Sequence, residues 1–336
     1  MTFNRIRPVA RQPLRRLVTA GLAMLATVGL SAPAHSAEQA FPDKVVRIVV
    51  PNPAGGASDV VARLIAQRLS DDWKQPVIVE NRAGAAGNIG ASLVAKAQPD
   101  GYTLLLMDAA SLAISPTLYP NLNYDPHKDL APVAIVAYSP HILVVKNDLP
   151  VKNLQELTTY ARSHPGQLNF GQTPGSITHL AGALLAQQQD FKWNYIGYKG
   201  GSQVLTDLAG GQIDAAMNSF LATYPLVKSG NIKMLAVASA ERFSLIPDTP
   251  TMAETVPGFA TGSWQGLFAT GGTPPPIVKK IHDDVQRITA TPDVQKRLAD
   301  LGSERTDMSP EAFAKWMTEQ TEYWRKVVAD NDIKLM

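Results

Sequence analysis

The segment VVRIVVPNPAGGASDVVARLIAQRL, residues 45–69, decides the fold of this chain. An apolar run leads into a Pro/Gly loop, and the loop opens onto apolar residues at helical spacing: Val61, Leu64, Ile65 and Leu69. The first N–H groups of a helix have no partner within the helix and lie at the positive end of its dipole, so such a junction can bind an anion. We expect Gly55 and Gly56 to expose these amides. Ser58 or Asp59 is the expected N-cap.

A second junction of the same kind follows about 120 residues later, in LNFGQTPGSITHLAGALLA, residues 168–186. One helix terminus contributes roughly 0.3–2 kcal/mol to the binding of an anion, whereas micromolar affinity requires about 8 kcal/mol. One loop is therefore not enough. We expect the two loops to face each other and to present amides to one acidic ligand.

The first 37 residues predict a signal peptide. They hold five arginines and no acid, followed by the short apolar run 17–30 and by small residues near Ala34, Ser36 and Ala37. The apolar run is too short to cross a bilayer comfortably, which argues against a retained anchor. We expect cleavage near Ala37 or Glu38, general secretion rather than twin-arginine export, and a periplasmic location.

The composition excludes several classes of function. The chain has 31 Lys and Arg against 29 Asp and Glu, and without the five arginines of the first 37 residues it has 26 against 29. A mildly acidic chain of this kind gives no reason to expect nucleic-acid binding. It has no cysteine, so disulfides, thiolate chemistry and Cys-ligated metals are excluded.

Alternation of β-rich runs with helical patterns predicts an α/β fold with a largely parallel sheet. The expected strands are 45–50, 77–80, 103–107, 142–146, 168–170, 213–217, 234–238 and 264–269. The expected helices include 58–69, 89–97, 154–163, 177–187 and 203–209. Residues 274–336 read as helices, with Thr273 as cap and Pro274 in the first turn.

Two stretches, 137–141 and 257–263, are the expected crossings between two domains. The first domain would then be discontinuous and comprise residues 38–140 and 260–336, and the second would comprise 141–259. Two crossing segments form a hinge that allows closure around a ligand.

Enzymatic patterns are weak in this sequence. Gly84, Gly87 and Gly90 follow a strand as a dinucleotide fingerprint would, but their spacing is GxxGxxG rather than GxGxxG. The motifs of serine hydrolases and zinc proteases are absent, and the histidines of the mature chain are scattered. We therefore expect no enzyme, no cofactor and no metal site. A secreted ester or amide hydrolase using the same cleft is the alternative.

From Phe41 onward the chain resembles the solute-binding receptors of tripartite tricarboxylate transporters, the Bug or TctC family. The resemblance rests on FPDKVVRIVVPNPAGGASDVVARLIA, VIVENRAGAAGNIGASLVAKAQPDGYTLL, PTLYPNLNYDPHKDLAPVA, GSITHLAG, YKGGSQVLTDLAGGQIDAAM and SWQGLFATGGTP. It implies a two-domain periplasmic binding protein, a Venus flytrap of type II with a mixed sheet flanked by helices in each domain. It also implies membrane transporter subunits as partners, and we expect a monomer.

The resemblance further implies which residues hold a ligand carboxylate. Carried over by position, these are Asn52, Pro53, Ala54, Gly55, Gly56, Ser58 and Asp59 in the first loop, with Asp108, Ala109 and Ser111 nearby, and Gln172, Thr173, Gly175, Ser176 and Thr178 in the second, with Tyr198 and Asp214 at its edges. For Asp59, an N-cap role competes with recognition of an ammonium or hydroxyl group. The hydroxyls of the second loop could cap their helix or bind a carboxylate, since both use the same geometry.

The expected function is capture of an aliphatic di- or tricarboxylate or an aromatic carboxylate, and its delivery to a transporter. A ligand-sensing partner of a two-component kinase would share this fold and ligand, and stays open as an alternative.

Overall fold

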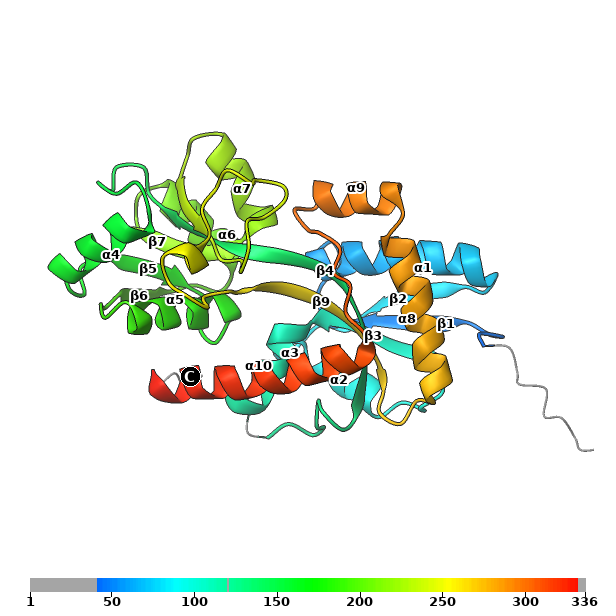
Figure 1. Ribbon diagram of the computed structural model, residues 1–336. Coiled ribbons are helices and arrows are strands. Elements are labelled where there is room, and N and C mark those ends of the chain that lie inside the picture. Colours follow the sequence, from blue (N-terminus) through cyan, green and yellow to red (C-terminus); the bar gives the residue numbers. More distant parts are fainter. Residues whose placement is uncertain (1–40, 120, 332–336) are drawn as a thin grey trace, which may run out of the picture. The chain divides into compact units, whose positions relative to one another are not determined.

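The computed structural model describes residues 41–119 and 121–331, so the predicted signal peptide lies outside the described residues (Figure 1). The strands are β1 (Val46–Val50), β2 (Val77–Asn81), β3 (Thr103–Asp108), β4 (Leu130–Val145), β5 (Asn169–Gln172), β6 (Asn194–Gly197), β7 (Ala215–Ser219), β8 (Lys233–Val237) and β9 (Gly262–Thr270). The α-helices are α1 (Ala57–Trp73), α2 (Asn88–Ala95), α3 (Ala109–Leu118), α4 (Leu154–Ser163), α5 (Ile177–Gln188), α6 (Gly201–Ala209), α7 (Phe220–Lys228), α8 (Pro275–Thr289), α9 (Pro292–Asp300) and α10 (Pro310–Asp330). Two 3₁₀ turns, Ala85–Gly87 and Met252–Glu254, complete them. Within this part of the chain, no helix is both long and apolar enough for a membrane span.

The first group of strands forms a mixed sheet in the order β2-β1-β3-β9-β4. β1, β2 and β3 are parallel, and β9 is antiparallel to both β3 and β4. The apolar residues of β1 are buried because helices cover the sheet, as is usual for parallel strands. Parallel order places the carboxyl ends of β1 and β3, and the helix starts that follow them, at the same edge.

The second group of strands follows the order β4-β7-β5-β6, with β8 on the other side of β4. β5 is parallel to β6 and β7, whereas β7 and β8 are antiparallel to β4. β4 is the shared strand. Its residues 130–140 pair with β9, its residues 141–145 pair with β7, and its residues 142–145 pair with β8. The predicted crossing at 137–141 therefore lies inside one continuous strand. Both groups of strands are mixed, as the family resemblance implied, and not largely parallel as the alternating pattern predicted.

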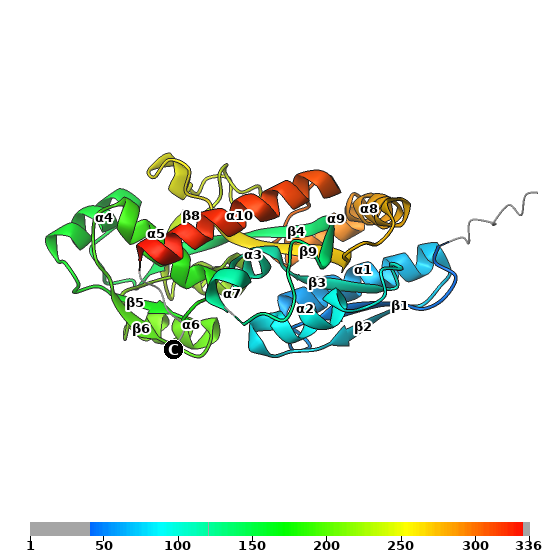
Figure 2. The same ribbon diagram turned by 90° about the horizontal axis from the view of Figure 1, so that it is seen from below.

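The long helix α10 packs on the cores of both strand groups. Phe313 and Met317 belong to the cluster that contains β3 and β9 residues, while Trp324, Val327 and Val328 belong to the cluster built on α4 and α5. Figure 2 shows α10 beside α3, and Thr321 Oγ1 donates to the carbonyl oxygen of Ala113 at 3.0 Å. The predicted domain bounds, which assign all of 260–336 to one domain, stay a prediction.

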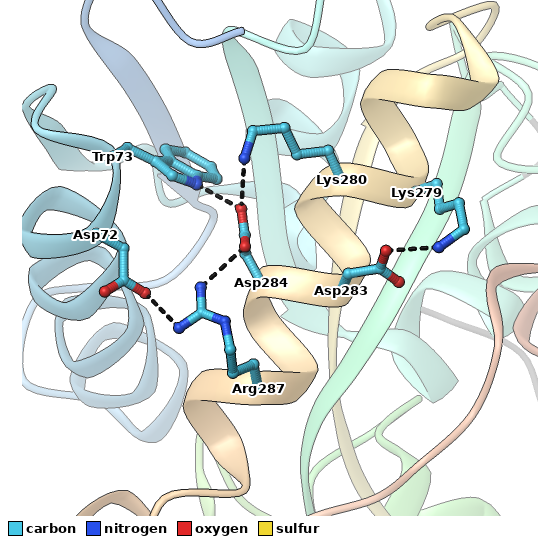
Figure 3. Close-up of polar contacts among 7 residues, drawn as sticks. All are labelled: Asp72, Trp73, Lys279, Lys280, Asp283, Asp284 and Arg287. Atoms are coloured by element: carbon cyan, nitrogen blue, oxygen red, sulfur yellow. Dashed lines mark hydrogen bonds and ion pairs between the residues drawn. The ribbon is translucent and has the colours of Figure 1, made fainter.

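α1 is held against α8 by a charged network (Figure 3). Asp284 accepts hydrogen bonds from Trp73 Nε1 at 2.6 Å, Lys280 Nζ at 3.0 Å and Arg287 at 2.9 Å. Arg287 also pairs with Asp72 at 2.9 Å. The C-terminal end of α1 is thereby fixed, and this anchors the helix whose other end carries the first loop.

Several predicted element bounds differ from the structure. α1 begins at Ala57 with Gly56 as N-cap, so the prediction of Ser58 or Asp59 as N-cap was wrong. α8 begins at Pro275, and Pro274 rather than Thr273 is its N-cap. In both cases the predicted and observed first residues of the helix differ by only one or two positions. Pro and Gly near a junction locate a helix start only to about that precision.

Candidate functional site

A cavity of about 440 Å³ lies where several elements end or begin. Its lining comes from the β1–α1 loop, the starts of α3, α5 and α7, and strands β4 and β9. The lining residues are Asn52, Pro53, Ala54, Gly56, Ala57, Ser58, Asp108, Ser111, His141, Ile177, Thr178, Asn218, Ser219, Ser263 and Gln265. The starts of four helices thus meet at one cavity, and the first N–H groups of a helix have no partner within the helix. Of these starts, those of α1 and α7 have no side-chain cap.

The first loop leaves the start of α1 open. Gly56, the N-cap residue, has φ −74° and ψ 167° and no side chain to cap the helix. The Asp59 side chain does not cap α1 either. Its carboxylate accepts from Gly55 N at 2.9 Å, from Asn81 Nδ2 at 2.9 Å and from Arg63 Nε at 3.0 Å. The hydrogen bonds from Arg63, with those of Gly55 and Asn81, lower the pKa of Asp59 to about 2. Asp59 therefore braces the loop and does not line the cavity.

Gly90 packs against the same loop from behind. A Cβ at this position would lie 2.8 Å from Pro51 Cβ and 3.1 Å from the Arg82 carbonyl oxygen. The glycine therefore allows α2 to approach the β1–α1 loop closely. This accounts for the Gly84–Gly90 pattern as a helix-entry loop without a dinucleotide.

Asp108, at the end of β3, lines the cavity. It caps α3 by accepting from Ser111 N at 2.7 Å, and it accepts from Trp264 N of the neighbouring β9 at 3.0 Å. Burial raises the pKa of Asp108, against the lowering effect of hydrogen bonds from Ser263 and Ser111. Ser111 also lines the cavity, whereas Ala109 is fully buried in the core.

The second loop contributes to the cavity through Ile177 and Thr178. Ser176 caps α5 by accepting from His179 N at 3.2 Å, and its Oγ lies 2.9 Å from Thr178 Oγ1. His179 Nδ1 accepts from Gly175 N at 3.2 Å, so this histidine contacts the backbone of its own loop. Capping thus occupies Ser176 and leaves Thr178 as the hydroxyl of this loop at the cavity.

The remaining residues predicted for ligand binding lie outside the cavity lining. Tyr198 donates its hydroxyl to Asp207 at 2.8 Å. Asp214 accepts from Asn169 N at 2.7 Å and pairs with Lys146 at 3.0 Å. The full set outside the lining is Gly55, Asp59, Ala109, Gln172, Thr173, Gly175, Ser176, Tyr198 and Asp214. The assignment of the whole list to ligand binding stays a prediction.

The start of α7 is a part of the cavity that the sequence analysis missed. Ser219 is its N-cap but makes no side-chain cap, and Asn218 Oδ1 accepts from Ser219 N at 2.8 Å. The sequence does indicate a helix start here, because the serine that ends AAMNS directly precedes the apolar residues of FLATYPLVK. Pro225 within that run obscured it.

His141, Ser263 and Gln265 were also missed, because strand pairing brings them to the cavity. His141 has 2% of its surface exposed, and its Nδ1 lies 3.2 Å from Thr261 Oγ1. Burial lowers the pKa of His141 to about 4, so it is neutral at pH 7. Gln265 stands opposite Asp108 in the β3–β9 register, and its Nε2 donates to Ser263 Oγ at 2.7 Å.

The cavity lining contains no lysine or arginine. Attraction for an anion there comes from peptide N–H groups and hydroxyls rather than from a cationic side chain. Over residues 41–119 and 121–331, no group of three or more His, Asp or Glu is placed to hold a metal ion. Peptide N–H groups and hydroxyls are donors that suit a carboxylate.

A larger cavity, of about 760 Å³, lies between α2 and residues 118–119 and 121–123. Pro174 is its one lining residue from the second loop, and the open start of α1 is not part of it. Volume alone would favour it. The smaller cavity has the convergent donors that orient a polar ligand, and is therefore the candidate site.

Comparison with known proteins shows the family of this chain. Residues 61–333 match the TctC model, described as tripartite tricarboxylate transporter family receptor. An R. palustris protein whose structure was solved with adipate is 34% identical to this chain. The alignment covers 88% of this chain and 100% of that protein's chain, with a TM-score of 0.76. MatC from Rhodopseudomonas palustris, with bound malate, is 35% identical over 86% of this chain and 100% of its own, with a TM-score of 0.72. The periplasmic binding protein BugD is 34% identical over 88% and 99%, also with a TM-score of 0.72. The chain therefore belongs to the TctC family of tripartite tricarboxylate transporter receptors, which are solute-binding proteins and not enzymes.

Proposed function

We propose that this protein is exported to the periplasm, captures a small carboxylate in the 440 Å³ cavity and delivers it to the membrane subunits of a tripartite tricarboxylate transporter. The observation that carries the proposal is the start of α1, which has no side-chain cap and lies at the cavity lining. A carboxylate is the natural partner of such a helix start.

The relatives support a carboxylate as the class of ligand. Two family members were solved with adipate and with malate, and both ligands carry two carboxyl groups. The uncapped start of α7, which lines the same cavity as the β1–α1 loop, supports a second polar contact. Several charge-assisted hydrogen bonds of roughly 1.5–3 kcal/mol each would then reach micromolar affinity.

The proposed domains are residues 38–140 with 260–336, and residues 141–259, with hinge segments at 137–141 and 257–263. The long strand β4, which pairs with strands of both groups, supports the first hinge segment. A solute that contacts both groups of strands would favour the closed state by its differential affinity. The protein is proposed to act as a monomer.

A thermal-shift screen tests this proposal. The full chain is expressed, the protein is purified from the periplasmic fraction, and its melting temperature is measured with aliphatic di- and tricarboxylates and with aromatic acids. A ligand at 100 times its Kd adds about 2.7 kcal/mol of stability, which is a shift of several degrees for a chain of this size. The diamides of the same acids are matched controls without charge. A shift with an acid and none with its diamide is expected, and equal shifts or none at all would contradict the proposal.

A further inference from the structure

Gln265 carries a buried acceptor without a partner at the wall of the proposed binding cavity. Its Oε1 makes no hydrogen bond, and the residue has 5% of its surface exposed. The side chain lines both the 440 Å³ cavity and a smaller one of about 240 Å³ that shares Ala57, Ser219 and Ser263 with it. A buried acceptor without a hydrogen-bond donor destabilises the folded protein. We therefore expect a ligand group to supply the missing donor here.

The hydrogen-bond network shows why an acceptor, and not a donor, is left over. Asp108 accepts from the backbone nitrogens of Ser111 at 2.7 Å and Trp264 at 3.0 Å. Ser263 Oγ accepts from Gln265 Nε2 at 2.7 Å. With Nε2 paired in this way, Oε1 is the polar atom of Gln265 that is left without a partner.

A carboxylate group of a ligand cannot satisfy this oxygen, since it is itself only an acceptor. A hydroxyl group or an ammonium group can. Oε1 has less than 1 Å² of accessible surface, so bulk water scarcely reaches it. The last torsion of a glutamine side chain is soft, so a small turn brings Oε1 to the cavity wall when a donor arrives.

We propose that Gln265 is a specificity-determining residue that selects a carboxylate bearing a hydrogen-bond donor, such as a hydroxy acid, over the same acid without it. This inference rests on the proposed function. It goes beyond it by naming the substituent that the site reads and the atom that reads it.

The test compares acids that differ by one hydroxyl: malate and succinate, 2-hydroxyglutarate and glutarate, lactate and propionate, mandelate and phenylacetate. Titration calorimetry on the periplasmic protein uses the pair whose tighter member binds best. We expect the hydroxy acid to bind about tenfold tighter or more, because the site otherwise keeps a buried acceptor unpaired.

Gln265→Met keeps the length of the side chain and removes the acceptor, so the preference should fall toward one. Thr223→Val is the matched control, since Thr223 Oγ1 is also buried and unpartnered but lies outside both cavity linings. This variant should keep the preference. Unaltered melting temperatures show that both variants fold.

A preference near one in the unaltered protein, or one that persists in Gln265→Met, would overturn the role of Gln265 while leaving carboxylate capture intact. Failure of every acid in the set to bind would instead refute the proposed function, and this inference with it.

Discussion

Replacing Gly56 by aspartate should convert the open start of α1 into a capped one. The backbone at Gly56 has φ −74°, which any residue can adopt, and a Cβ would meet only the Pro53 carbonyl oxygen at 3.4 Å. The new carboxylate would accept from the first amides of α1, as N-cap aspartates do. It would thus occupy the donors that we assign to the solute.

The loss in affinity can be bounded from charge alone. Two carboxylates about 4 Å apart repel by about 1 kcal/mol in bulk water and by about 4 kcal/mol at an effective dielectric constant of 20. Gly56→Asp should therefore weaken carboxylate binding by roughly 5-fold to 1,000-fold. Stability should rise by a few tenths of a kcal/mol, because aspartate caps a helix slightly better than glycine does.

Gly56→Asn is the matched control, since it has the same shape and capping ability without the charge. Isothermal titration of both variants with the tightest acid from the thermal screen should show Gly56→Asp binding more weakly than Gly56→Asn, by a factor that decreases with added salt. Equal affinities in the two variants, or an affinity of Gly56→Asp equal to that of the unaltered protein, would refute the reasoning.

Three further predictions concern stability. Asp59→Asn should remove about 1–2 kcal/mol of the free energy of unfolding above pH 4, after allowance for the exposed Arg63. Because the pKa of Asp59 is lowered to about 2, the unaltered protein loses this contribution as the pH falls from about 4 to 2. Urea melts at several pH values show whether the variant lacks that pH dependence. The pKa of His141 in the folded protein, about 4, lies below its unfolded value, so its contribution to the free energy of unfolding is fully present above pH 6.5. The free energy of unfolding should fall by about 2 kcal/mol between pH 6.5 and pH 5. The same decline in a His141→Gln variant would exclude this residue as its source. Asp284→Asn should lower the free energy of unfolding by about 1–2 kcal/mol, because it weakens the hydrogen bonds with Lys280 and Arg287, and should leave the Kd for the carboxylate unchanged. Asp283→Asn loses only the exposed ion pair with Lys279 and should change the free energy of unfolding by no more than about 0.5 kcal/mol. Similar losses of stability in the two variants would contradict the role of this network.

The two strand–loop–helix junctions could be predicted from sequence because their signals are local. Gly55, Gly56 and the apolar spacing of α1 lie within one short segment, as do Ser176 and the apolar face of α5. The N-cap of α1 was still misplaced, since Ser58 and Asp59 are good capping residues and the sequence does not show that Asp59 turns toward Arg63.

The far wall of the cavity could not be predicted in this way. Gln265 reaches Asp108 through the pairing of β9 with β3, and His141 enters through β4, whose prolines at positions 132 and 140 made the strand read as separate pieces. Register between strands distant in sequence depends on the whole sheet. Local patterns carry no information about it.

The most direct measurement is a crystal structure of the periplasmic protein with its tightest carboxylate. We expect a carboxylate oxygen within about 3 Å of backbone nitrogens at the start of α1, in the cavity that Thr178 and Gln265 also line. A carboxylate seated in the 760 Å³ cavity beside α2, with the start of α1 facing only water, would contradict it.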